Sequence, residues 1–65
     1  MKKYYEIVGK DQNEDWCTIA DEIKTLKQAI AKAKKLDKEE WLEIDINLII
    51  DDDLKETYDI NGKIR

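Results

Sequence analysis

Apolar and polar residues alternate in two stretches of the first third of the chain, which predicts two β-strands. The first, Lys3 to Gly9, is a run rich in aromatic and β-branched residues. The second, Trp16 to Ile23, places Cys17 and Ile19 on one face and Trp16 and Thr18 on the other. The polar segment KDQNED between them is typical of a loop, so the two strands should form a hairpin.

A helix is predicted next, at Leu26 to Asp37. Thr25 stands three residues before Gln28, which is the capping-box spacing of a helix start. Apolar residues then recur at intervals of three and four, and this stripe should lie on the sheet: Leu26, Ala29, Ile30, Ala33 and Leu36. Six lysines fall on the opposite arc: Lys24, Lys27, Lys32, Lys34, Lys35 and Lys38.

The clearest alternation in the chain, Trp41 to Ile50, predicts a third strand. Its inward residues are all aliphatic, namely Leu42, Ile44, Ile46, Leu48 and Ile50, and its outward residues are Trp41, Glu43, Asp45 and Asn47. Three aspartates, Asp51, Asp52 and Asp53, should form a turn into a fourth strand at Leu54 to Ile60. Asn61-Gly62 is a favoured two-residue hairpin turn that folds the tail back.

These elements predict a single α+β domain over residues 1–65, in the order β-β-α-β-β. One helix should pack on one face of a four-stranded sheet, and the third strand should be central because its inward face is aliphatic. No segment reaches the roughly 20 apolar residues that span a bilayer, and the first residues do not resemble a signal peptide. We therefore expect a cytoplasmic protein that does not enter a membrane.

The composition argues against an enzyme. Histidine and serine are absent and Cys17 is the only cysteine, which removes the common catalytic triads, a histidine base and histidine or multi-cysteine metal sites. We predict that Cys17 is a small buried hydrophobic residue. Neither a cofactor nor a metal site is expected.

The net charge of −4 conceals a strong asymmetry. Residues 24–38 carry +5, while the other fifty residues carry −9. The lysines suit either a solvated helix face or contact with phosphate groups, for which Lys27, Lys34, Lys35 and Lys38 are the candidates. The net negative charge and the single arginine make direct nucleic-acid binding the weaker alternative.

The sheet face turned away from the helix should combine aromatic and acidic residues. Alternation assigns to it Tyr4, Glu6, Trp16, Thr18, Trp41, Glu43, Asp45, Thr57 and Asp59. Such a face is either a contact surface, with a homodimer as one option, or a set of cross-strand pairs without a partner. The Asp51–Asp53 run and Glu56 lack the spacing of an EF-hand loop, so a solvated turn is favoured over a calcium site.

The stretch from Trp16 to Ile44, with its TLKQAIAKAKKL helix and WLEI strand, resembles small β-β-α-β-β proteins of bacteriophages and mobile elements. Some proteins of that kind, including anti-CRISPR proteins, inhibit host defence. The resemblance carries no functional residue to any position here. It implies an enzymatically inert protein that acts by occupying a surface of a larger one.

Two hypotheses of function follow. The leading one is a non-enzymatic binding protein that presents Trp41, Glu43, Asp45, Asp51, Asp52 and Asp53 to a basic surface of a host protein. The alternative is a small nucleic-acid-binding or regulatory module that works through the helix lysines.

Overall fold

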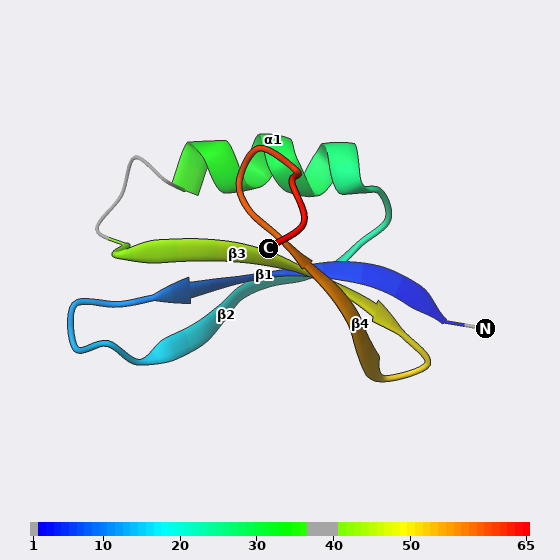
Figure 1. Ribbon diagram of the computed structural model, residues 1–65, viewed down its shortest axis with the longest axis horizontal. Coiled ribbons are helices and arrows are strands. Elements are labelled where there is room, and N and C mark those ends of the chain that lie inside the picture. The colour runs from blue at the N-terminus through cyan, green and yellow to red at the C-terminus, as the bar shows by residue number, and fades with distance from the viewer. Residues whose placement is uncertain (1, 37–40) are drawn as a thin grey trace.

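The computed structural model of the protein describes residues 2–36 and 41–65 and confirms the predicted α+β arrangement (Figure 1). The elements are β1 (Lys3–Lys10), β2 (Trp16–Ile23), α1 (Leu26–Leu36), β3 (Glu43–Ile50) and β4 (Asp53–Tyr58). The predicted helix end at Asp37 lies outside the described residues, as does Lys38.

The four strands form one sheet in the order β2-β1-β3-β4, and every neighbouring pair is antiparallel. The prediction that the third strand is central is confirmed, because β1 and β3 form the two inner strands. Their pairing runs without interruption from Lys3 opposite Ile50 to Lys10 opposite Glu43. The connection from β2 to β3 crosses β1 through α1, which lies along one face of the sheet (Figure 1).

The core lies between α1 and the sheet. Ile7 and Ile46 are fully buried, and Ala29 and Ala33 are the buried residues of the helix. Two small residues on the inner face of α1 allow the helix to approach the strands closely. The helix begins as predicted, because the Thr25 hydroxyl accepts a hydrogen bond of 3.1 Å from the Gln28 amide.

The connection between β3 and β4 is shorter than the predicted three-aspartate turn. Ile50 pairs with Asp53, so only Asp51 and Asp52 form the loop and Asp53 begins β4. Both loop residues have positive φ, 51° for Asp51 and 69° for Asp52, which is the backbone of a type I′ turn. The Asp51 carboxylate also accepts a hydrogen bond of 2.9 Å from the Lys2 amide.

The tail folds back as predicted, but through a different turn. Three residues, Ile60 to Gly62, connect Asp59 to Lys63, and the Asp59 carboxylate accepts hydrogen bonds from the amides of Asn61 and Lys63. The prediction of a two-residue turn at Asn61-Gly62 was therefore wrong. The side chain of Asp59 organises a longer loop, in which Gly62 alone has positive φ. The fourth strand consequently ends at Tyr58 rather than Ile60, and Tyr58 bridges to Ile64.

Three side chains lie on the opposite side from the prediction or in a different environment. Trp41 was expected to face away from the helix, but its indole lies over Gly9 and packs against the core. Leu42 is correspondingly exposed. The reason is that β3 begins only at Glu43, so the alternation does not extend to the two preceding residues, and Gly9 leaves room for an indole. Cys17, expected to be buried, is exposed on the edge strand β2.

Candidate functional site

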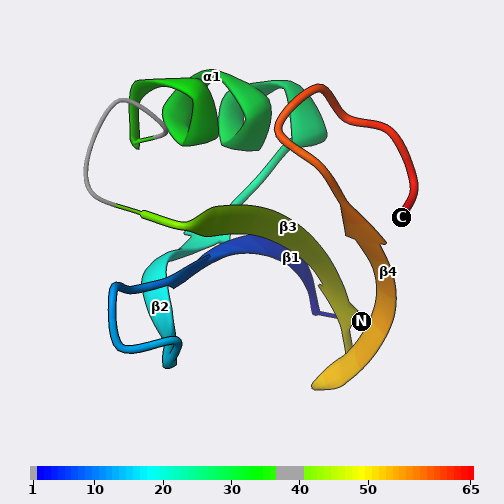
Figure 2. The same cartoon turned by 60° about the vertical axis from the view of Figure 1, so that its left-hand side comes forward.

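The sheet face turned away from α1 is uncovered by any described helix or strand, and we call it the open face (Figure 2). Strand register defines its rows, because directly paired residues share a face. Across the sheet these rows consist of Trp16, Lys10 and Glu43, then Thr18, Val8 and Asp45, then Glu6, Asn47 and Thr57.

A chain of polar side chains crosses the open face from β1 to β4. Asn47 donates a hydrogen bond of 3.1 Å to Glu6, and the Thr57 hydroxyl donates one of 2.9 Å to the Asn47 carbonyl oxygen. Asn47 is thus held from both sides. This arrangement fixes the polar groups of the three strands relative to one another.

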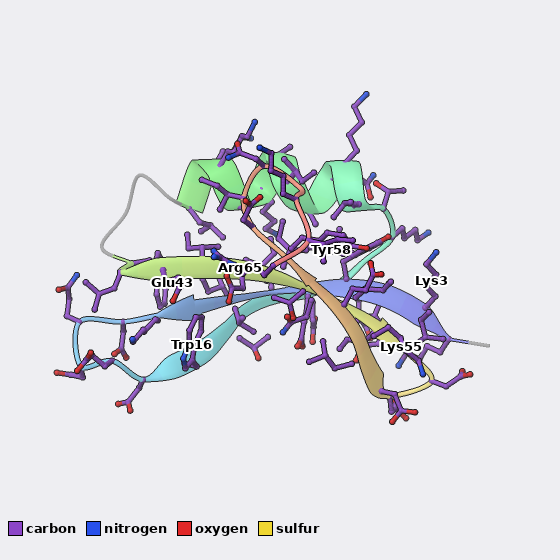
Figure 3. All side chains as sticks on the ribbon, in the orientation of Figure 1. Lys3, Trp16, Glu43, Lys55, Tyr58 and Arg65 are labelled. Carbon is purple, nitrogen blue, oxygen red and sulfur yellow. The ribbon has the colours of Figure 1, made fainter. Side chains whose placement is uncertain are left out.

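Arg65 returns to the open face, where it lies near Glu43 (Figure 3). It contacts both acidic residues that the sequence singled out on β3. Its Nε lies 2.5 Å from Oδ1 of Asp45, and its Nη1 lies 3.6 Å from Oε1 of Glu43. Its Nη2 donates to the Ile44 carbonyl oxygen at 3.5 Å, and its backbone amide donates to the Thr57 carbonyl oxygen at 2.9 Å. Glu43 and Asp45 are therefore not free carboxylates.

Asp45 is the most enclosed of these acids, with 15% of its side chain exposed. Burial raises the pKa of Asp45, and the attraction of Arg65 opposes that rise without cancelling it. Glu43 adds repulsion that raises the pKa further. Among the described residues, Oδ1 of Asp45 has no well-aligned hydrogen bond, and its contact with Nε of Arg65 is a close ion pair.

A hollow of about 290 Å³ opens beside Asp45 on the open face. Its lining, which defines what we call the hollow, is Val8, Trp16, Asp45, Asn47 and Thr57. Trp16 is 48% exposed and supplies an aromatic wall. The hollow thus offers apolar surface, one carboxylate and two polar groups that are already bonded to each other.

Asp51, Asp52 and Asp53 form a separate acidic group, the hairpin tip, where all three are exposed. Asp51 stands eight positions after Glu43, a length of about 25 Å in an extended strand. The six residues predicted to bind a partner are therefore divided among three environments. Trp41 packs against the core, Glu43 and Asp45 pair with Arg65, and the aspartates occupy the hairpin tip.

The helix lysines lie on the other side of the molecule from the open face. Lys27, Lys34 and Lys35 are exposed, and the last two lie in the final turn of α1. No ion pair to a carboxylate is found for them within residues 2–36 and 41–65. Lys38 lies outside the described residues.

Sequence reasoning missed the part that Arg65 plays in this region. From the sequence, Arg65 was considered only as the single arginine of the chain, in the argument against nucleic-acid binding. The signal that would have found it is the turn after Tyr58: a chain that reverses there runs back beside β4 and brings an arginine to the carboxylates of β3.

The described part of the chain contains no group of three or more histidine, cysteine or acidic side chains arranged to hold a metal ion. It also contains no helix long and apolar enough to cross a membrane. A scan against protein-family models, a search of curated proteins and a search of solved structures each found no match.

Proposed function

We propose that this chain is a non-enzymatic protein-binding domain, of the kind that phages and mobile elements use as inhibitors, directed at a basic surface of a host protein. The surface it offers is the hairpin tip together with the acids of the open face. The host protein is one that handles nucleic acid or acts in defence, since such proteins carry basic surfaces for phosphate groups.

The observation that carries the proposal is the choice of residues in the β3–β4 turn. Both loop positions have positive φ, where glycine, asparagine and aspartate are favoured. Aspartate suits the first position, where the Asp51 carboxylate also accepts a hydrogen bond from the Lys2 amide, whereas glycine is preferred at the second. Asp53 adds a third neighbouring negative charge. Folding alone would favour glycine at position 52, so the aspartate there supports a role for its charge.

The charge of the surrounding segment supports the same proposal. Residues 41–59 hold seven acidic residues against the single Lys55. Carboxylates on a rigid hairpin match arginine and lysine side chains that otherwise contact phosphate, and a concentrated negative charge speeds encounter with a basic partner.

The test begins with affinity purification from the natural host, which identifies the partner. Association kinetics with that partner are then measured for a variant with Asp51, Asp52 and Asp53 all changed to Asn. Asparagine keeps the side-chain size and accepts positive φ, so a loss of binding would not reflect unfolding. We expect association to slow at least about tenfold, as for loss of electrostatic steering.

The control changes Lys27, Lys34 and Lys35 to Gln on the opposite side of the molecule. Because it makes the net charge more negative, it should not slow association with a basic partner. The proposal fails if the triple asparagine variant associates as fast as the unmodified protein. It also fails if charge reversal at Glu43, Asp45 and Asp52 leaves partner capture intact.

Nucleic-acid binding through α1 is the second candidate, favoured by the exposed lysines in the last turn of the helix. A salt titration against DNA and RNA separates it from the first. Binding that weakens steeply with salt and disappears in the lysine-to-glutamine variant supports this alternative, whereas absence of binding at low salt removes it.

A further inference from the structure

We propose that Glu43, Asp45 and the adjoining hollow form an arginine-binding site, in which Arg65 of the same chain already contacts the two carboxylates. An arginine of the partner would replace Arg65 there. This inference rests on the proposed function, because it names the chemistry by which the open face recognises a basic partner.

The first support is that a guanidinium group is already seated among these acceptors. Arg65 contacts the carboxylates of Asp45 and Glu43 and the carbonyl oxygen of Ile44. A planar guanidinium has five N–H donors in a fixed fork, which suits three acceptors arranged around it. An ammonium group presents a compact point charge and matches this arrangement less well.

The second support is the hollow, which adjoins the Asp45 carboxylate on the open face. Val8 and Trp16 provide apolar and aromatic surface next to the carboxylate. An arginine entering from outside can lay its aliphatic stem against Val8 and its guanidinium near the indole face, where cations are attracted. Asn47 and Thr57 are bonded to each other, so they shape the wall without presenting a second charge.

Arg65 is held closely at one point, by the 2.5 Å contact between its Nε and Asp45, and loosely elsewhere. Its side chain is 41% exposed, and its contacts to Glu43 and Ile44 are long, at 3.6 and 3.5 Å. The backbone of the tail is fixed independently by the turn that Asp59 organises and by the bridge between Tyr58 and Ile64. The Arg65 side chain can therefore swing out while the tail stays in place, and the enclosed Asp45 carboxylate then requires another cation.

Cis occupation lowers the apparent affinity for an external arginine in proportion to the fraction of molecules in which the site is open. If about one molecule in ten is open, removing Arg65 should tighten binding about tenfold. The experiment titrates the full chain and its Arg65→Ala variant with N-acetyl-arginine amide, following backbone amide signals by NMR. We expect saturable shifts at Val8, Asp45 and Thr57, with a dissociation constant about tenfold lower in the variant.

Two controls define specificity. N-acetyl-lysine amide should bind the variant several-fold more weakly, and Asp45→Asn in the Arg65→Ala background should abolish the shifts. If Arg65→Ala does not fold, Arg65→Gln, which keeps the aliphatic stem without the charge, takes its place. Equal binding of the two amides, shifts that survive Asp45→Asn, or no gain on removing Arg65 would each overturn the arginine site.

The outcomes separate this inference from the function on which it rests. If N-acetyl-arginine amide does not bind but partner capture still depends on Asp51, Asp52 and Asp53, the arginine site is overturned. The proposal of a protein-binding domain then still stands. Arginine binding as expected, with partner capture indifferent to those three aspartates, supports the site and overturns the part assigned to the hairpin tip.

Discussion

The Trp41 indole lies directly over Gly9, so the substitution Gly9→Ala tests how tightly this indole packs against the core. A Cβ at this position would lie 2.7 Å from Cε3 and 2.9 Å from Cδ2 of Trp41, and 2.6 Å from Cδ1 of Ile19. The Ile19 methyl ends a flexible side chain and can rotate away. The indole is rigid, so the whole ring must shift.

Two opposing terms set the size of the effect. Overpacking a core position costs about 1–3 kcal/mol. Replacing glycine by alanine recovers about 0.4–1 kcal/mol, because it restricts the unfolded chain. At the middle of the two ranges, about 2 and about 0.7 kcal/mol, Gly9→Ala should lower the free energy of unfolding by about 1.3 kcal/mol. The melting temperature should then fall by roughly 5–10 °C in a domain of this size.

The assay is urea denaturation followed by far-UV circular dichroism, arranged as a double-mutant cycle with Trp41→Leu. Leucine removes the rigid ring, so Gly9→Ala should cost less than half as much in that background, a coupling of about 1 kcal/mol. Ile19→Val, which shortens the flexible neighbour, should relieve the cost much less. An alanine variant as stable as the unmodified protein, or a cycle without coupling, would refute the packing of Trp41 over Gly9.

Three further predictions follow from single contacts. Changing Asp51-Asp52 to Asn-Gly should raise the free energy of unfolding by about 1 kcal/mol, because both positions have positive φ; an unchanged urea midpoint would contradict the turn geometry. Thr25→Ala should lower the free energy of unfolding by about 1 kcal/mol, because the helix cap is lost, while Thr25→Ser should leave it unchanged in the same urea denaturation. The hydrogen bond from Tyr58 to Glu56 raises the pKa of Tyr58 to about 12, so the stability it contributes is complete below pH 10 and is lost as the pH rises through 12. Glu56→Gln should return that pKa toward 10.0 in an absorbance titration, and an unaltered curve would count against the contact.

The fold was predictable because its signals are local and repeated. The alternation from Ile44 to Ile50 and the three- and four-residue spacing in α1 each follow from one periodicity, and the Thr25 cap from one short motif. These patterns fixed the element order and the inner face. They did not contain the strand order, which depends on contacts between residues distant in the sequence.

The errors occurred where the periodicity of an element ends. Trp41 stands two residues before β3, so its orientation is set by the space above Gly9 rather than by strand alternation. Likewise, the hydrogen bonds of the Asp59 carboxylate determine the turn that brings Arg65 to the open face. The orientation of Trp41 and the form of the turn after Tyr58 each depend on one specific contact. A repeating sequence pattern does not encode such a contact.

The strand order also has a consequence for how the chain folds. The two outer pairings, β1 with β2 and β3 with β4, join neighbouring segments, whereas the central pairing of β1 with β3 joins residues 33 to 47 positions apart. Closing loops of that length costs roughly 3 kcal/mol of chain entropy. Only the interactions of the completed core offset this cost. Two hairpins can therefore form early and separately, and their joining along the middle of the sheet is the slow, all-or-none step that makes a single cooperative unit.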